Sequence, residues 1–371
     1  MEKANVSIFE LCGSNYEIGY QLVKIAMNCP QFAEMQKCPP GAYTEKQAAQ
    51  MTEMFDCYCP GLNEELQGFA EAIKTTRLQM LYYAMTYLTP GCSLLAVLPK
   101  LTANGHVMAA RNYEFSHKME DFSFCKTKVT GKYAHMGGSM MQFGRGEGIN
   151  ECGLMAAQTS CGMPVGNMEV MRRPAVTGLQ FWAVIRSLLE NCKNVEEALQ
   201  TLEDMPIAYN INLILADKEG NAALFETLDG VKAFRKIDDT TEQQYLHSTN
   251  HAHLQEIINL EPMAMKHSVC RYNYIENFVN QSHGINTRDL KTLLLSKYPE
   301  GLCCNWYDNF FGTIKSMVFD VTLGTVEICW GGLEKNGWQT YSLVNDIKAE
   351  NFTVDIKTSN SQFEDGAFVK I

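Results

Sequence analysis

The stretch that decides the fold is Thr89-Pro-Gly-Cys-Ser-Leu-Leu-Ala-Val-Leu98. A Pro-Gly break follows a helical pattern here, and a cysteine then begins a short apolar run that is typical of a buried strand. A free cysteine is most often a small buried hydrophobe. Cleavage of the chain between Gly91 and Cys92 would instead give this cysteine a free α-amine, which can serve as the base for the thiol of the same residue.

The two residues before the cysteine suit such a cleavage. Gly91 leaves its carbonyl unhindered and tolerates strained backbone angles, so that the thiol can attack it. Pro90 fixes φ and limits the freedom of the loop. The free amine titrates at about 7.7–8.0 and a thiol at about 8.5, so no histidine is needed to take the proton. The junction therefore predicts a hidden N-terminal nucleophile at Cys92.

A second strand is expected to pair with the one that Cys92 begins. Asn104-Gly105 is a turn signal, and strand-like residues follow it. A two-residue turn there would set Cys92 opposite His117, whereas a wider loop would set it near Asn112. Pro99 cannot donate to a strand ladder, which favours the wider loop.

The expected partner strand carries Arg111-Asn-Tyr-Glu-Phe115 at its end. A guanidinium near a thiol favours the thiolate, so Arg111 beside Cys92 would activate it. Glu114 could orient the amine. We therefore expect this hairpin to bring a cation and a carboxylate to the cysteine.

The rest of the chain changes character near residue 90. Residues before it read as helices, and residues after it as strand pairs separated by helices. Strands are expected at 106–110, 210–215, 222–226, 231–237, 313–320 and 325–330, and helices at 16–27, 44–57, 63–73, 78–88, 179–189, 195–202, 268–279 and 287–294. Because strands cluster with strands, the fold class is α+β with antiparallel sheets rather than βαβ repeats. Two sheets between helix layers would use this inventory.

Composition excludes several classes of protein. The 371 residues carry 31 Lys+Arg against 42 Asp+Glu, a formal net charge of −11, which is a poor match for nucleic acid or an anionic membrane. The 14 cysteines include no C-x-x-C pair, and disulfide scaffolds belong to shorter chains. The N-terminus lacks a signal peptide, and the most apolar stretch, 78–98, is too interrupted to span a membrane. We expect a cytoplasmic protein.

Five segments in order resemble a known family. Gly91-Cys-Ser93, followed by Asn104-Gly-His-Val-Met-Ala-Ala-Arg-Asn-Tyr-Glu-Phe115, is similar to the penicillin (isopenicillin N) acyltransferases. These are N-terminal nucleophile hydrolases related to choloylglycine hydrolases and penicillin V acylases. The other segments are 11–19, which resembles the start of the acyltransferase propeptide, Gly148-Ile-Asn-Glu-Cys-Gly-Leu154, Ser248-Thr-Asn-His251 and Ser268-Val-Cys-Arg271.

The resemblance implies a four-layer αββα sandwich. Residues 1–91 would form a helical leader packed on a catalytic domain of residues 92–371. The chain would release Cys92 by itself and then hydrolyse, or transfer the acyl group of, a linear amide in an N-acyl small molecule through an acyl-thioester. The resemblance implies no cofactor and no metal. The oligomeric state is left open, with a homo-oligomer among the possibilities.

The resemblance also assigns roles residue by residue. Cys92 is the nucleophile, and its amine is the base. Arg111 supports the thiolate and the substrate, and Glu114 takes the position of the family's aspartate. Asn250 is an oxyanion donor, which suits an amide N–H facing a carbonyl that gains negative charge. Arg271 is a structural or assisting cation.

Two departures from the family pattern matter. Glu114 is one methylene longer than the aspartate. Thr159-Ser160 stands where bile-salt enzymes place an asparagine, which argues against a bile-salt hydrolase, as does the long leader. The second oxyanion donor is therefore open, and a backbone N–H near Leu94 or Ser160 could serve.

Three other patterns could indicate a functional site, but the sequence favours a structural role for each. His247, His251 and His253 could bind a metal, but no carboxylate partner stands at a recognised spacing, which favours core or surface histidines. Cys303-Cys304 could be a redox pair, although adjacent cysteines rarely bridge without strain. Gly144-Arg-Gly-Glu-Gly148 lacks the lysine of a phosphate loop, so we expect a flexible loop. A non-catalytic binding or scaffold protein with an intact chain is the alternative function.

Overall fold

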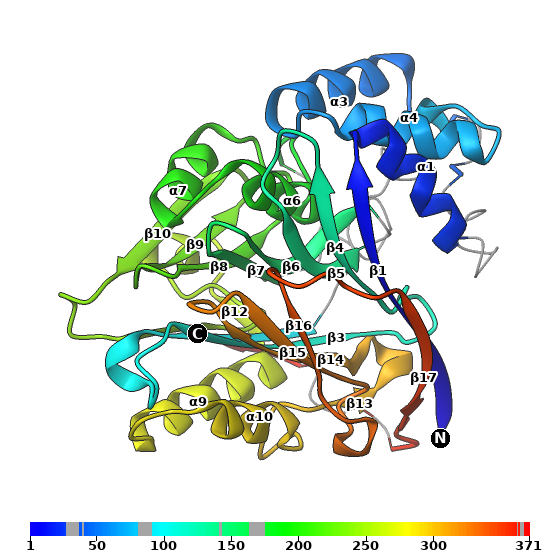
Figure 1. The fold of residues 1–371 in the computed structure, drawn as a ribbon. Helices are drawn as coiled ribbons and strands as arrows, with labels where there is room; N and C mark the ends of the chain where they lie inside the picture. Colours follow the sequence, from blue (N-terminus) through cyan, green and yellow to red (C-terminus); the bar gives the residue numbers. More distant parts are fainter. Residues whose placement is uncertain are drawn as a thin grey trace.

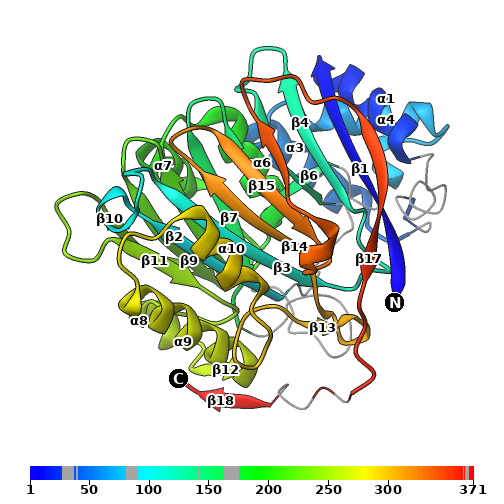
Figure 2. The same ribbon diagram turned by 60° about the horizontal axis from the view of Figure 1, so that its bottom comes forward.

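Two large β-sheets face each other, and helices cover their outer faces (Figures 1 and 2). The computed structural model describes residues 1–26, 37–38, 41–80, 91–140, 143–162, 175–361, 363 and 367–371. Helices α6 and α7 lie over one sheet, and helices α9 and α10 lie under the other. The predicted α+β class and αββα layering are confirmed.

The upper sheet has nine strands in the order β10-β9-β8-β7-β6-β5-β4-β1-β17. Their bounds are β1 Glu2–Gly13, β4 Ser123–Val129, β5 His135–Met140, β6 Gly144–Asn150, β7 Leu154–Ser160, β8 Ile211–Asp217, β9 Ala222–Leu228, β10 Val231–Ile237 and β17 Glu350–Ile356. All the pairings are antiparallel except that of β1 with β4. Strands β4 to β10 are buried almost throughout, except for the edge strand β10.

The lower sheet holds the strand that Cys92 begins. Its order is β11-β2-β3-β14-β15-β16, and β13 also pairs with β14. The bounds are β2 Gly91–Val97, β3 Met108–Phe115, β11 Tyr245–Ser248, β13 Asn305–Trp306, β14 Phe311–Asp320, β15 Thr325–Trp330 and β16 Gln339–Ser342. A separate small sheet joins β12 Met263–Met265 to β18 Phe368–Lys370.

The β2–β3 register follows the wider loop that Pro99 favours, because a 3-10 turn at Pro99–Leu101 fills the connection. Cys92 lies opposite Tyr113, one residue from the expected Asn112, and Leu94 lies opposite Arg111. The alternative register with His117 is wrong.

The helices begin and end near the predicted positions. They are α1 Asn15–Ala26, α3 Glu45–Tyr58, α4 Leu62–Ala72, α6 Phe181–Asn191, α7 Val195–Asp204, α8 Gln255–Ile258, α9 Lys266–Gln281 and α10 Thr287–Leu295. Helix α3 starts at a capping box in which Thr44 and Gln47 satisfy each other's backbone N–H groups. None of the helices in the described ranges has the length and apolar character that crossing a membrane requires.

The expectation that residues 1–90 are helical is wrong for the first segment. Glu2–Gly13 forms β1, in which Ala4, Val6 and Ile8 are buried at the period of a strand. The helix expected over 78–88 falls largely outside the described residues, as do Thr89 and Pro90; the described part is a 3-10 turn, Arg77–Gln79. The N-terminal segment is therefore part of a sheet as well as a helical layer.

The flexible loop expected at 144–148 is also wrong, because these residues begin strand β6 and are fully buried. The glycines are there for space. A Cβ added at Gly148 would lie 2.7 Å from Cδ1 of Leu189 and from the carbonyl oxygen of Met136. Glycine here permits close packing of β6 against β5 and against helix α6.

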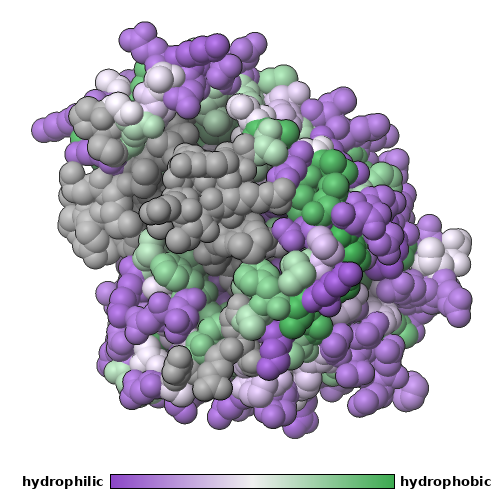
Figure 3. Space-filling model, turned by 180° about the vertical axis from the view of Figure 1, so that it is seen from behind, coloured by the Kyte–Doolittle hydropathy of each residue, from purple (hydrophilic) through white to green (hydrophobic). Residues whose placement is uncertain are grey.

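Hydrophilic side chains predominate on the face seen from behind in Figure 3, where the described residues form it, and several apolar patches lie near the grey residues.

Candidate active site

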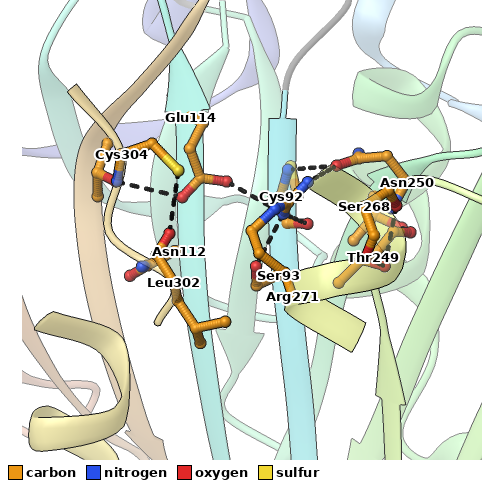
Figure 4. Close-up of polar contacts among 12 residues, drawn as sticks. Cys92, Ser93, Asn112, Glu114, Thr249, Asn250, Ser268, Arg271, Leu302 and Cys304 are labelled. Atoms are coloured by element: carbon orange, nitrogen blue, oxygen red, sulfur yellow. Dashed lines mark hydrogen bonds and ion pairs between the residues drawn. The ribbon is translucent and has the colours of Figure 1, made fainter. Parts of the chain in front are cut away.

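Cys92 is fully buried near the start of β2, where three predicted site residues contact it. Figure 4 shows two of them, Asn250 and Arg271. Its nitrogen, here a peptide amide, donates to Oδ1 of Asn250 at 2.9 Å. Its carbonyl oxygen accepts from Nη1 of Arg271 at 2.5 Å. Its thiol lies 3.4 Å from Nη2 of Arg111. Residues separated by as much as 179 positions therefore converge on one cysteine.

The end of a short strand explains this convergence. Strand β11 stops at Ser248, which lies opposite Leu94 of β2. Continuing that register by two residues places Asn250 opposite Cys92. The backbone groups of Cys92 that face this side are bound by the side chains of Asn250 and Arg271 instead of a strand. The ladder is thus replaced by side-chain contacts at the cysteine.

Arg111 shares a face of the sheet with Cys92, because alternate residues of a strand point the same way. Its Nε forms an ion pair with Oε2 of Glu147 at 2.8 Å, and its Nη1 donates to the carbonyl of Gln158. Glu147 also pairs with Lys315 at 3.0 Å. Sequence reasoning missed Glu147 because it stood in the glycine-rich segment that was read as a loop.

Glu114 lies on the opposite face of β3, across from Gly91. Its carboxylate is 3.7 Å from Nη1 of Arg271 and 3.4 Å from the hydroxyl of Thr313. In this structure Asn250, and not Glu114, holds the nitrogen of Cys92.

Burial dominates the protonation of the site. It raises the pKa of the Cys92 thiol to about 12, although Arg111 opposes the shift. It raises the pKa of Glu114 to about 7 against the opposition of Arg271 and Arg111. Burial also disfavours ionised Glu147, but Lys315 and Arg111 outweigh it and lower its pKa. With the chain joined, the thiol is protonated at neutral pH.

Asn250 is held at both ends of its amide. Oδ1 accepts from Cys92 and also from Nη2 of Arg271 at 2.8 Å. Nδ2 donates to Ser160, at 3.0 Å from the hydroxyl and 3.4 Å from the carbonyl. The backbone N–H of Asn250 donates to the hydroxyl of Ser268 at 2.7 Å. The N–H that an oxyanion role requires therefore faces Ser160.

Of the three remaining oxyanion candidates, Leu94, Thr159 and Ser160, only Ser160 contacts the side-chain amide of Asn250 in the described residues. Leu94 is paired on both sides, with β3 and with β11, so its backbone N–H belongs to a ladder. Thr159 donates to the carbonyl of Thr249 at 2.6 Å and so holds the loop that carries Asn250. Ser160 is the candidate that the structure brings to the amide of Asn250.

The three histidines cluster around Tyr272, and His247 and His251 are buried. The rings of His247 and His253 stack on Tyr272 at 4.0 and 4.6 Å between centroids. Burial lowers the pKa of His247 to about 4 and that of His251 to about 3. Nδ1 of His251 lies 2.8 Å from the hydroxyl of Ser268, next to Asn250. Within the described ranges, no group of three His, Cys, Asp or Glu residues could hold a metal ion.

The thiols of Cys303 and Cys304 are not bonded to each other and have different hydrogen-bond partners. The Cys303 thiol donates to the carbonyl of Gly332 and the Cys304 thiol to that of Leu302, each at 3.3 Å. Both are free. Cys304 also connects to the site, since its backbone N–H donates to the same Thr313 hydroxyl that contacts Glu114.

Comparisons with solved structures find matches at low identity. A penicillin V acylase from Agrobacterium tumefaciens is 17% identical, with a TM-score of 0.39 over 64% of this chain and 83% of that one. An N-acylethanolamine-hydrolyzing acid amidase ortholog from Caenorhabditis elegans is 13% identical, with a TM-score of 0.44 over 62% of this chain and 94% of that one. A mutant of conjugated bile acid hydrolase from Clostridium perfringens is 12% identical, with a TM-score of 0.41 over 74% of this chain and 100% of that one. No curated protein matches the chain.

A family model gives the stronger result. The model for acyl-coenzyme A:6-aminopenicillanic acid acyl-transferase matches residues 101–335, which are 235 of the 371 residues. The match includes Arg111, Glu114, Asn250 and Arg271, and it begins nine residues after Cys92. The chain therefore belongs to the acyl-coenzyme A:6-aminopenicillanic acid acyl-transferase family, and it is an enzyme of the hydrolases and acyltransferases that act on amide bonds.

Proposed function

We propose that the chain cleaves itself between Gly91 and Cys92 and then uses Cys92 to hydrolyse or transfer the acyl group of a linear amide in an N-acyl small molecule. One observation carries the proposal. Cys92 follows a glycine near the start of β2, with its nitrogen on Asn250 and its thiol beside Arg111. These are the two groups of a single residue that the mechanism uses as base and nucleophile.

The release step needs only this residue, its neighbour and water. The sulfur of Cys92 attacks the carbonyl carbon of Gly91, the thiol proton passes to the Cys92 nitrogen, and the C–N bond between them breaks to leave a thioester and an amine. Water then hydrolyses the thioester. The products are a Gly91 carboxylate and a Cys92 with a free amine and a free thiol. The leader of residues 1–91 and the catalytic segment of residues 92–371 become separate chains.

Gly91 is required for space rather than for the strained angle expected of it. Its φ lies outside the left-handed region. A Cβ there would lie 2.9 Å from Cβ of Glu114 and 3.1 Å from Cδ2 of Phe311. A side chain at this position would push the scissile carbonyl away from its strand pairing, which favours glycine at the junction.

In turnover, the free amine of Cys92 takes the thiol proton, and the thiolate attacks the substrate carbonyl. The amine then gives the proton to the departing nitrogen, and an acyl-thioester forms on Cys92. Water or a second amine takes the acyl group. Nδ2 of Asn250, with the hydroxyl of Ser160 beside it, donates to the oxyanion, while Arg111 stabilises the sulfur. Arg271 and Glu114 fix the strand that carries the nucleophile.

Intact mass and denaturing electrophoresis test the proposal. We expect fragments of 91 and 371 − 91 = 280 residues, and a Cys92→Ala chain that stays whole and hydrolyses no amide. Cys125→Ala is the matched control, because Cys125 is an equally buried strand cysteine in the other sheet, and it should still split. A wild-type chain that stays whole and hydrolyses no amide would instead support the non-catalytic binding protein.

A substrate panel then selects the acyl group and the amine. The panel contains N-acyl amino acids, penicillins, acyl-homoserine lactones and conjugated bile acids. The assays belong in reducing buffer, because the thirteen cysteines that the structure describes are all free, which supports a cytoplasmic location.

A further inference from the structure

Three fully buried charged side chains join the two sheets beside Cys92. Arg111 comes from β3, Lys315 from β14 and Glu147 from the facing strand β6, and none is more than 1% exposed. We call these three residues the charge bridge. Burying three charges is costly even when they are paired. A bridge of this kind beside a nucleophile therefore calls for a functional explanation.

Both sheets deviate from regular pairing where the bridge passes. The β14–β3 register shifts between Thr313 and Lys315, and the β5–β6 register shifts between Gly138 and Ser139. A Cβ added at Gly138 would overlap both Nζ of Lys315 and Oε1 of Glu147. Bulges commonly re-aim a side chain next to an active site. Here one bulge in each sheet, and a glycine, make room for the pair of Lys315 and Glu147.

Each oxygen of Glu147 is used by a different cation. Oε1 forms an ion pair with Nζ of Lys315 at 3.0 Å and accepts from the N–H of Gly138 at 3.2 Å. Oε2 faces Nε of Arg111 at 2.8 Å. A guanidinium beside a carboxylate usually pairs through two N–H groups at once. With Oε1 occupied, Nη2 of Arg111 is left to face the thiol of Cys92 at 3.4 Å.

We infer that Lys315 is a positioning residue for the nucleophile: by occupying Oε1 of Glu147 it prevents the two-pronged pairing of Arg111 and turns Nη2 toward Cys92. The inference rests on the proposed role of Cys92. Without Lys315, Oε1 becomes an acceptor for Nη2, and the guanidinium rotates away from the sulfur.

The net charge of the charge bridge also favours the thiolate of Cys92 when Lys315 is present. Nζ of Lys315 and the guanidinium of Arg111 lie 5.1 and 5.6 Å from the centre of the Tyr113 ring. Glu120 also faces Lys315, but burial raises its pKa to about 8, so it is mostly neutral at pH 7. The charge bridge then has a net charge of +1. Removing Lys315 leaves a net charge of zero and exposes the thiol to the negative charge of Glu147, which disfavours the thiolate.

Alkylation by iodoacetamide measures this effect without any turnover. Below the pKa of a thiol, the alkylation rate is proportional to its thiolate fraction, so a shift of one pKa unit changes the rate tenfold. We compare wild type, Lys315→Met, Glu147→Gln and the double variant between pH 6 and 9, and locate the modified cysteine by mass spectrometry. Cys125, buried in the other sheet, reports opening of the fold in the same sample.

Relative to Cys125, Lys315→Met should slow alkylation of Cys92 by about tenfold. The double variant should return to within about threefold of wild type, because it removes the carboxylate that captures Arg111 and restores the net charge of +1. A purely structural Lys315 predicts a double variant that reacts no faster than Lys315→Met, and that result, or an unchanged rate in Lys315→Met, overturns the inference. Lys315→Gln replaces the methionine variant if the latter fails to fold.

Failure of the proposed function looks different. It appears as a wild-type chain that neither splits nor hydrolyses amides, whereas the alkylation comparison gives a result in either case.

Discussion

Two buried arginines of this molecule make opposite use of their N–H groups. Arg186 of α6 pairs with both oxygens of Glu65 in α4, at 2.7 and 2.5 Å, and its Nε pairs with Glu190 at 2.9 Å. Arg111 touches Glu147 through Nε alone and points Nη2 at Cys92. A guanidinium whose three nitrogens all donate to carboxylates fixes one element on another. One that keeps a donor for a thiol suits the proposed role of that thiol as a nucleophile.

The surroundings of the two arginines follow the same division. Arg186 ties the N-terminal helices to the upper helix layer, where Phe55 and Trp182 also meet edge to face at 5.8 Å. Arg111 lies between the two sheets, where the register of both is distorted. Both arginines are buried, so burial does not distinguish them. The difference lies in the N–H donors that each arginine has left for groups other than its carboxylate partner.

The largest expected effect tests Arg186, the arginine that ties helix α4 to helix α6. Glu65→Ala leaves Arg186 buried without its two-pronged partner, so we expect a loss of about 3–5 kcal/mol in the free energy of unfolding. Urea denaturation measures it in a Cys92→Ala background, where self-cleavage does not interfere. Glu65→Ala in the otherwise wild-type chain should still split at Gly91, because the contacts of Cys92 are untouched.

A surface pair is the control for Glu65→Ala. Lys236 and Glu196 are paired at 2.8 Å but are 35% and 59% exposed. Lys236→Ala should therefore change stability by less than about 1 kcal/mol. If Glu65→Ala costs no more than Lys236→Ala, Arg186 does not fix helix α4 and the comparison fails.

The second prediction tests Arg111, the arginine beside the proposed nucleophile Cys92. Arg111→Lys keeps the charge but loses the planar fork, so one ammonium cannot face both Glu147 and Cys92 as Nε and Nη2 do. We expect self-cleavage and amide turnover to slow about 100-fold, which corresponds to about 2.7 kcal/mol of activation free energy. Rates come from the appearance of the 280-residue fragment and from product formation.

The same substitution at the other arginine is the matched control. Arg186→Lys should lower stability but leave the rate of self-cleavage of the folded protein within about threefold. Equal slowing in both variants would mean that buried charge in general, and not the free donor of Arg111, controls the reaction.

Much of the site could be predicted because its chemistry is local. The Gly91-Cys92 junction, a strand with Arg111 and the loop with Asn250 each had a recognisable motif, and the structure brings them together. The layers were predictable from the clustering of strands. The register was predicted to within one residue, since Pro99 excludes the tight turn.

The parts that were missed depend on contacts between distant elements. Glu147 and Lys315 meet only because two sheets face each other, and no spacing in the chain reports that. The glycines around Glu147 resembled a loop, since glycine is rare in strands, yet Gly148 leaves room for the side chain of Leu189. Strand β1 did carry a signal, the alternation of Ala4, Val6 and Ile8, which a helical reading of the leader overlooked.

The smallest expected effect is the pH dependence of stability that comes from Glu114, the carboxylate beside Arg271. Burial raises the pKa of Glu114 from 4.5 to about 7, against the opposition of Arg271. Between these values the folded chain holds a proton that the unfolded chain has released, so stability is greatest at low pH and falls as pH rises toward 7. Between pH 5 and 7 we expect a loss of about 2 kcal/mol from this group.

Glu114→Gln isolates that contribution, because glutamine keeps the shape and has no proton to lose. In a Cys92→Ala background, urea denaturation at pH 5, 6 and 7 should show a slope that is steeper for Glu114 than for the glutamine variant. Other groups titrate equally in both chains and cancel in the difference. Parallel slopes would mean that Arg271, 3.7 Å away, keeps Glu114 ionised throughout. Glu114 and Arg271 would then form a permanent ion pair, in which Arg271 still donates to the carbonyl of Cys92 and to Asn250.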